Sequence, residues 1–100
     1  MKTILAAPAG YHDYAAVCEA VLKAGFPITE VLTVMAPPEN TLSRRWAREN
    51  GVPLKELAGS PVDHAQALIA VWDGECENTG DVIREARSKE LEVYVHLVAK

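Results

Sequence analysis

Cysteine is scarce in this sequence. The chain of 100 residues has two cysteines, Cys18 and Cys76, which are far apart and form no CxxC motif. Disulfide-based folds and cysteine-based zinc sites need repeated or closely spaced cysteines, so the sequence argues against both. Cys18 lies on the apolar side of a predicted helix, where we expect the thiol to pack as a small hydrophobe.

Clustered basic residues are also lacking. The formal net charge is −4, and the nearest approach to a basic patch is Arg44, Arg45 and Arg48 in one segment. Neutralisation of phosphates by Lys and Arg supplies most of the affinity of a protein for nucleic acid. We therefore expect no nucleic-acid partner, and we interpret the arginines as part of an exposed, charged helix face.

Long apolar runs are absent. The most apolar stretch, Ala65–Trp72, is far shorter than the roughly 20 residues that a membrane-spanning helix needs. The N-terminal segment MKTILAAPAG has one lysine and a short apolar run that leads directly into a helical pattern. We interpret it as a first strand rather than a signal peptide. The sequence thus predicts a cytoplasmic protein without a membrane partner.

Residue patterns of catalysis and metal binding are missing as well. His12, His64 and His96 are scattered along the chain, and no HxxxH pair or His–Cys–Asp cluster occurs. No serine lies in a nucleophile-elbow motif. The motifs therefore predict no catalytic residue, no metal and no cofactor.

What the sequence does contain is a regular alternation of two patterns. Short apolar or β-branched segments alternate with segments whose apolar residues recur at three- and four-residue steps. Strands are predicted at Thr3–Ala7, Thr29–Met35, Val52–Leu57, Ala65–Trp72 and Glu92–Val98, and helices at residues 12–25, 41–51 and 78–89, with a possible single turn within Ala58–His64. The alternation predicts one α/β domain over residues 1–100, a three-layer Rossmann-like open sheet of about five mainly parallel strands with helices on both faces.

In such a sheet, ligands bind outside the carboxyl ends of the strands, where the strand order reverses. Three segments qualify: Pro8–His12, Ala36–Asn40 and Asp73–Thr79. The aromatic rings of Tyr11 and Trp72 could stack on a planar ligand there. The candidate ligand-binding residues are Pro8, Ala9, Gly10, Tyr11, Asp13, Pro37, Glu39, Asn40, Trp72, Asp73, Gly74, Asn78, Thr79 and Gly80.

The third segment, VWDGECENTGD, has an unusual charge. It contains four carboxylates and no cation, while Asn78 or Thr79 is expected to cap the next helix and Asp81 to lie in its first turn. An unassisted phosphate would be repelled there, although a divalent cation could reverse the sign. Three interpretations remain open: a solvated acidic loop, a metal site, or a site for an uncharged or cationic ligand or a protein partner.

The order of the motifs resembles a known family. The segments ILAAPAGYHDY, RRWARENGVPLKEL, ALIAVWDGECENTGDVIREAR and EVYVHLV are similar to the small YspA-like branch of the SLOG superfamily, and RWARENGVP and ALIAVWDG are the most specific parts. These are Rossmann-like domains related to the LOG phosphoribohydrolases and to the DNA-processing protein DprA. The resemblance implies binding or processing of a nucleotide-derived ligand.

The chain departs from that family where phosphate would bind. Ala7, Pro8 and Ala9 take the place of a Gly-Ser-Arg turn, and Pro37-Pro38 the place of a glycine-rich turn. Proline has no N–H to offer an anion, and its fixed φ excludes the positive values that glycine adopts. Glu39 adds a negative charge. The PGGxGT turn that would position the catalytic arginine and glutamate of a LOG enzyme is also absent.

These features favour a non-catalytic member of the family. Two roles remain open for it: binding of a small nucleotide-related ligand, or a degenerate scaffold that acts through protein contacts as a homo-oligomer. The second role is supported by the closing strand, in which both alternating sets of side chains are largely apolar, as is typical of an edge or interface strand. The alternative is a hydrolase of the LOG type that cleaves an N-glycosidic bond.

Overall fold

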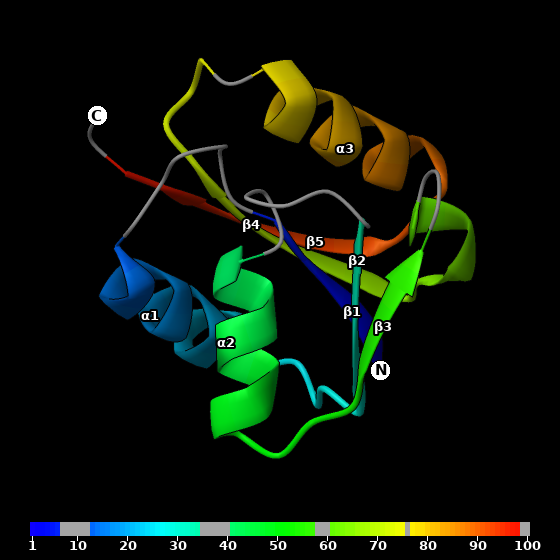
Figure 1. Ribbon diagram of the computed structural model, residues 1–100. Coiled ribbons are helices and arrows are strands. Elements are labelled where there is room, and N and C mark those ends of the chain that lie inside the picture. Colours follow the sequence, from blue (N-terminus) through cyan, green and yellow to red (C-terminus); the bar gives the residue numbers. More distant parts are fainter. Residues whose placement is uncertain (7–12, 35–40, 58–60, 76, 99–100) are drawn as a thin grey trace.

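The structure of the protein is a computed structural model that describes residues 1–6, 13–34, 41–57, 61–75 and 77–98. Within these ranges the side chains of Val34, Thr41, Leu57, Pro61 and Asn78 are not described. The elements follow one another in the order β1 (Lys2–Ala6), α1 (Tyr14–Ala24), β2 (Glu30–Val34), α2 (Thr41–Glu49), β3 (Leu54–Leu57), η1 (Pro61–His64), β4 (Ala67–Trp72), α3 (Glu77–Ser88) and β5 (Glu92–Leu97) (Figure 1).

The five strands form one sheet in the order β3-β2-β1-β4-β5, and all four neighbouring pairs are parallel. The register places Ile4 of β1 between Leu32 of β2 and Leu68 of β4. The predicted fold class, an α/β Rossmann-like open sheet, is therefore confirmed, and the mainly parallel sheet is wholly parallel in the described residues.

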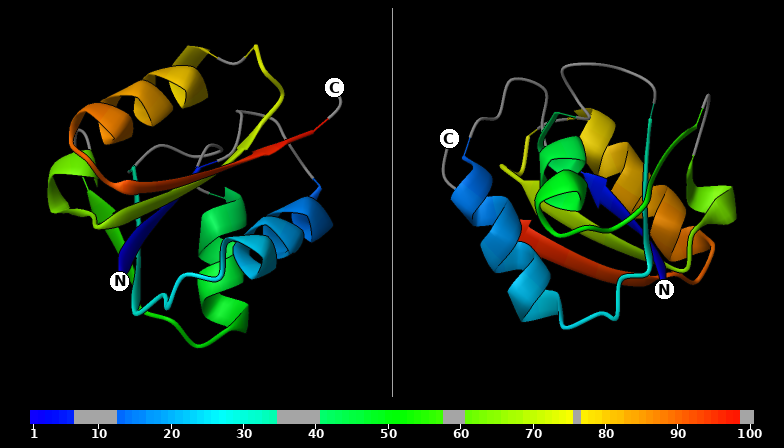
Figure 2. Two further views of the ribbon diagram at one scale, coloured as in Figure 1. Left: turned by 180° about the vertical axis from the view of Figure 1, so that it is seen from behind. Right: turned by 60° about the horizontal axis from the view of Figure 1, so that its bottom comes forward.

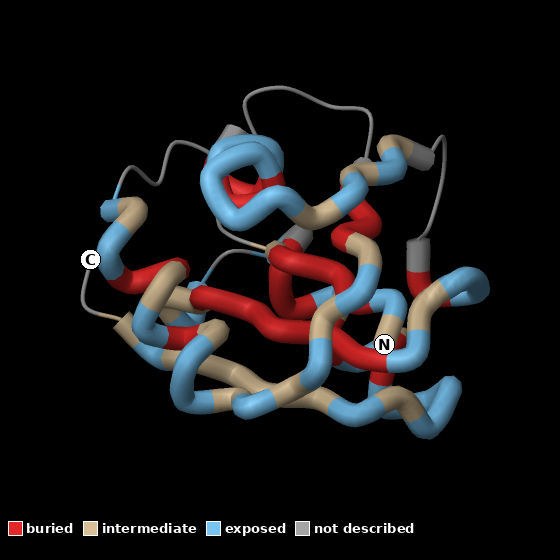
Figure 3. The backbone as a smooth tube through the Cα atoms, turned by 90° about the horizontal axis from the view of Figure 1, so that it is seen from below, coloured by how far each residue is buried: buried red, intermediate tan, exposed pale blue. Residues whose placement is uncertain are grey.

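Two helices cover one face of the sheet and the remaining elements cover the other. α1 and α2 pack on the first face, and α3 and η1 on the second (Figures 1 and 2). Successive strand residues alternate between the faces, so Ile4 joins the core under α3 while Leu5 joins the core under α1 and α2. β4 is buried on both sides from Ala67 to Val71, which explains its continuous apolar sequence. Buried residues, red in Figure 3, lie in the inner strands and on the sides of the helices that face the sheet.

The ends of α1 are set by local hydrogen bonds. Asp13 is the N-cap, and its carboxylate accepts a hydrogen bond from the Ala16 N–H at 3.4 Å. At the other end Gly25 adopts φ 68°, and its N–H donates to the Val21 carbonyl. Both predicted limits of this helix, at residues 12–13 and at Gly25, are confirmed.

α2 buries Leu42, Trp46 and Ala47, which recur at the spacing of one helix face. Gly51 follows the helix at φ 64°, a conformation that suits glycine, so the chain reverses where the sequence indicates. The single turn predicted within residues 58–64 is the short 3₁₀ helix η1.

The start of α3 differs from the prediction. The helix begins at Glu77, so Asn78 and Thr79 lie inside its first turn instead of capping it. Asp81 accordingly lies beyond the first turn, whose acidic residue is Glu77. The predicted inward face is correct, because Ile83 and Ala86 are buried and Val82 packs against the same core. Among the helices of the described ranges, none combines the length and the apolar character needed to cross a bilayer.

Candidate functional site

The strand order reverses between β1 and β4. α1, the helix that follows β1 in the sequence, packs on one face of the sheet, and α3, the helix that follows β4, packs on the other (Figure 1). Ligands of parallel sheets bind outside the carboxyl ends of strands at such a reversal.

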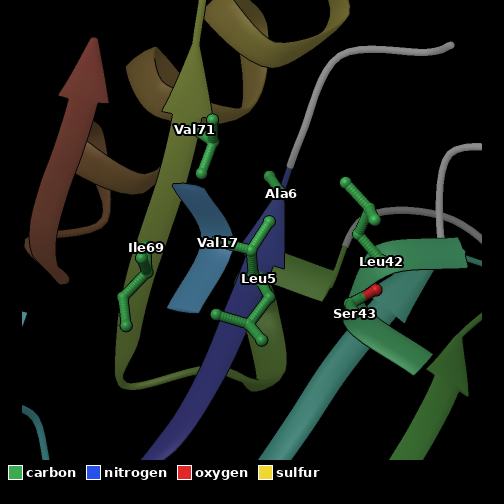
Figure 4. Close-up of a pocket in the computed structure, with 7 residues that line it drawn as sticks. All are labelled: Leu5, Ala6, Val17, Leu42, Ser43, Ile69 and Val71. Carbon is green, nitrogen blue, oxygen red and sulfur yellow. The ribbon is translucent and has the colours of Figure 1, made fainter. Parts of the chain in front are cut away.

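A hollow lies at this point, on the face covered by α1 and α2 (Figure 4). The free space inside it is about 10 Å³, room for roughly one water molecule. We call it the apolar hollow. Its described lining consists of Leu5, Ala6, Val17, Leu42, Ser43, Ile69 and Val71. Four elements thus supply a floor in which a single side chain, that of Ser43, is polar.

The hydroxyl of Ser43 is used within the protein. Its Oγ donates to Oγ1 of Thr33 at 3.2 Å, and both residues are buried. A buried hydroxyl without a partner would be costly, so this bond satisfies a polar group that α2 brings against β2. The apolar hollow therefore offers a ligand mainly carbon surface.

Tyr14 lies at the start of α1 on the same face of the sheet. Burial, assisted by a hydrogen bond with Cys18, raises the pKa of Tyr14 to about 12. The guanidinium of Arg45 stacks over the ring at 4.0 Å from its centroid. Tyr14 therefore keeps its proton at neutral pH and cannot serve as a base there. Cys18 packs against this core, as expected.

The arginines of α2 form a separate surface. Arg44, Arg45 and Arg48 border a hollow of about 530 Å³ together with Ala47, Val52 and Leu54. Arg44 pairs with Glu56 at 3.0 Å, and Arg45 pairs with Glu49 at 2.7 Å. Since carboxylates neutralise two of the three charges, this surface is the exposed charged face that the sequence predicts.

On the other face of the sheet, the segment after β4 forms its own turn. Asp73 accepts a hydrogen bond from the Glu75 N–H at 2.8 Å, and Gly74 adopts φ 84°. An aspartate that bonds the backbone two residues ahead is a common turn element, and a positive φ favours glycine. Asp73 and Gly74 thus have a structural use in the turn that leads toward α3.

This turn and the first half of α3 border a second hollow, of about 470 Å³. We call it the acidic hollow. It is lined by Trp72, Gly74, Glu75, Glu77, Gly80, Asp81 and Arg84. Three acidic residues face one cation, Arg84, which is already paired with Asp81. A phosphate would meet net negative charge here.

Trp72 packs against the helix that follows it. A Cβ built on Gly80 would lie 3.2 Å from Cζ2 of the indole, so the missing side chain lets the ring approach α3. The ring belongs to the core under α3, on the face opposite the apolar hollow. Trp72 is therefore a packing residue at the end of β4.

The structure brings some candidate residues together and separates others. Trp72, Gly74 and Gly80 meet at the acidic hollow, whereas Asp13 caps α1 and Thr79 is buried inside α3. The side chain of Asn78 is not described. Pro8, Ala9, Gly10, Tyr11, Pro37, Glu39 and Asn40 lie outside the described residues. In the described ranges no group of three or more His, Cys, Asp or Glu side chains could hold a metal ion.

The sequence predicts where the site lies, at the carboxyl ends of the strands, but it predicts none of the residues that line the apolar hollow. Leu5, Val17 and Val71 come from three elements that are distant in the sequence, and they meet only because β1 and β4 are neighbours. Strand alternation indicates which of them face α1. The order of the strands, which the sequence leaves open, decides that they share one hollow.

Comparison of the chain with protein-family models, with curated proteins and with solved structures found no significant match. The site is therefore interpreted from its own geometry.

Proposed function

We propose that the chain is a non-catalytic binding domain that holds a small nucleotide-related molecule over the carboxyl ends of β1 and β4. The observation that carries the proposal is the reversal of the strand order between β1 and β4. The carboxyl ends of strands at such a reversal are the usual ligand site of an open parallel sheet. The apolar hollow is too small to hold the molecule itself and forms the floor beneath it.

The lining of the hollow favours the base of such a molecule. The floor beneath the proposed site is apolar and almost closed to solvent: Leu5, Ile69 and Val71 line it, and the Ser43 hydroxyl is engaged with Thr33. The faces of a nucleobase are planar and gain from burial against apolar side chains. A hydrophilic sugar or phosphate would gain less from the same floor.

The negative charge near the carboxyl end of β4 disfavours a phosphate on the ligand. Glu75 and Glu77 border the acidic hollow at the carboxyl end of β4, and Arg84 is paired with Asp81. A phosphate group next to them would be repelled unless a cation accompanied it. We therefore propose an uncharged ligand, a nucleoside or base, in preference to a nucleotide.

The described lining also supports a non-catalytic role. General acid–base catalysis needs a titratable side chain within hydrogen-bond distance of the reacting atom. The described residues of the apolar hollow include no carboxylate and no imidazole, and Tyr14 nearby keeps its proton.

Thermal unfolding in the presence of adenosine, adenosine monophosphate, or the monophosphate with Mg²⁺ tests the proposal. A ligand at ten times its Kd stabilises the folded state by about 1.4 kcal/mol. For a chain of this size that raises the Tm by roughly 6–10 °C. We expect the largest rise with adenosine. No rise with any of the three at millimolar concentration would contradict the proposal, and release of free adenine would favour the hydrolase alternative.

A pair of variants locates the binding. Ala6→Phe adds bulk at the carboxyl end of β1, where Ala6 is half-buried, whereas Val52→Phe adds bulk at a half-buried position ahead of β3, at the opposite end of the strands. We expect Ala6→Phe to weaken adenosine binding at least about ten-fold and Val52→Phe to leave it unchanged. Equal effects of the two variants would place the ligand elsewhere. Far-UV circular dichroism checks that both variants fold.

A further inference from the structure

The two edges of the sheet differ in length and in charge. β3, at one edge, has four residues and includes Lys55 and Glu56. β5, at the other edge, has six residues and no formally charged side chain from Val93 to Leu97 if His96 is neutral. Short length and charge are the usual means by which proteins keep an edge strand from pairing with another chain. β3 has both, whereas β5 is longer and has a formally charged residue only at its first position, Glu92.

The backbone of β5 has one side free among the described residues. The N–H groups of Glu92 and Val98 donate to carbonyls of Gln66 and Trp72, at 3.2 and 2.9 Å, on the side of β4. Backbone groups alternate in direction along a parallel strand, so those of Val93, Val95 and Leu97 point away from β4. No described strand lies beyond β5 to pair with them.

An exposed apolar side chain accompanies these backbone groups. Leu97 is 68% exposed, and its register partner on β4 is Trp72. On the opposite face of β5, Tyr94 and His96 stack with their ring centroids 6.5 Å apart. The edge thus combines unpaired backbone groups with apolar and aromatic side chains, the features of a strand that receives another strand.

We propose that β5 pairs in antiparallel fashion with β5 of a second copy of this chain, with Val95 opposite Val95 across a two-fold axis. The result is one continuous sheet that runs through both copies. The proposal is independent of the ligand-binding function.

The outward backbone groups fix this register. In an antiparallel pair, two opposite residues exchange hydrogen bonds only when the backbone N–H and C=O groups of both point toward the partner strand. Val95 opposite Val95, with Val93 opposite Leu97 on each side, pairs every outward residue of β5 and forms about six interchain hydrogen bonds. The same register covers the exposed Leu97 with a valine and places Tyr94 opposite His96.

The charges on α1 complement themselves in this arrangement. Glu19 pairs with Lys23 at 2.8 Å and lies 4.0 Å from His96. Lys23 lies one helical turn further along α1, and as a crossover helix of a parallel sheet α1 runs antiparallel to the strands, so Lys23 lies toward the level of Tyr94. The two-fold axis places His96 of one copy opposite Tyr94 of the other. Glu19, which is near His96, therefore faces Lys23 of the other copy. Opposite charges therefore meet across the interface, which favours a second copy as the occupant of the edge.

Sedimentation equilibrium of the whole chain and of two variants tests the proposal. Leu97→Lys adds a positive charge at the proposed interface, and Asn50→Lys adds one at the exposed residue that follows α2, the helix beside β2 and β3. We expect a dimer whose Kd rises at least about ten-fold in Leu97→Lys and less than about two-fold in Asn50→Lys. A chain that stays monomeric at about 1 mM, or a dimer that is insensitive to Leu97→Lys, would overturn the proposal.

Amide hydrogen exchange tests the register. At concentrations above the Kd, the amides of Val93, Val95 and Leu97 should become as slow to exchange as those of Tyr94 and His96. Below the Kd they should exchange quickly. A dimer in which these three amides stay fast would show that another surface joins the copies.

A charge swap tests the role of α1. Lys23→Glu should weaken the dimer, because it places two carboxylates together within one copy and across the axis. The double variant Glu19→Lys with Lys23→Glu restores both pairs and should recover the original Kd. Failure of the double variant to recover would contradict the proposed two-fold arrangement.

Discussion

The two sides of β4 differ sharply where the strand ends. Ile69 and Val71 face α1 and α2 and form part of the apolar hollow. Trp72, the next residue, faces α3 and borders the acidic hollow. The end of β4 thus lies between an apolar hollow on one face of the sheet and an acidic hollow on the other.

The difference arises from the segments that cover each face. α1 and α2 bring Val17 and Leu42 to the first face, and the chain after β4 brings Glu75 and Glu77 to the second. Strand alternation alone would make both faces apolar. The strands therefore determine the place of a site in this fold, while the segments that cover them determine its chemistry.

Val71→Asp should have the largest effect on stability, because it places a charge on the apolar side of β4. An unpaired carboxylate at a position that is 1% exposed should lower the free energy of unfolding by about 4 kcal/mol. Urea denaturation followed by circular dichroism measures it. A loss below about 1 kcal/mol would mean that water reaches the floor of the apolar hollow, and the contrast between the faces would disappear.

Gly80→Ala measures how closely Trp72 packs in the acidic hollow. Alanine stabilises a helix interior by about 1 kcal/mol relative to glycine. The new Cβ would also press on the indole at 3.2 Å. We expect this full gain when Trp72 is first replaced by Leu, and little gain or a loss in the natural chain. Equal effects in the two backgrounds, by thermal unfolding, would show that the ring moves freely.

Neutralisation of the acidic hollow should change ligand preference by a smaller amount. Glu75→Gln with Glu77→Gln removes two negative charges near the carboxyl end of β4. At distances of about 8–10 Å in water, each charge contributes roughly 0.5 kcal/mol. The affinity for adenosine monophosphate should therefore rise about two- to five-fold, and that for adenosine should stay constant. Calorimetric titration measures both, and a parallel change in the two affinities would contradict the account.

Asp81→Asn should have the smallest effect on stability. The pair between Asp81 and Arg84 is exposed on both sides, and such pairs contribute about 0.2–1 kcal/mol. We expect the free energy of unfolding to fall by roughly 0.3 kcal/mol, and less at high salt. A loss above about 1 kcal/mol would show that the pair organises the acidic hollow.

Much of the fold could be predicted from the sequence, because buried parallel strands and amphipathic helices have strong patterns. Val17 of α1, for example, lies on the apolar face that the helical spacing predicts and is buried, whereas Leu22, assigned to the same face, is 82% exposed. The start of α3 was predicted wrongly at Asn78 or Thr79, since several residues that can cap a helix occur in succession there. The helix begins one residue earlier, at Glu77.

The site was harder to predict than the fold. The acidic character of the segment after β4 follows directly from its residues, and the structure brings Trp72, Gly74 and Gly80 together there. The apolar hollow depends on the adjacency of β1 and β4, which results from long-range packing. Local patterns contain no information on that adjacency, so Leu5 and Val71 could be assigned to the core but not to a site.

The most direct test of the proposed function is a titration of the isotope-labelled chain with adenosine, followed by the amide resonances. If adenosine binds over the apolar hollow, the largest shifts occur at Leu5, Ser43 and Val71, and the shifts at Gly80 and Arg84 are small. The largest shifts at Gly80 and Arg84, or no shifts at millimolar adenosine, would contradict the proposed function.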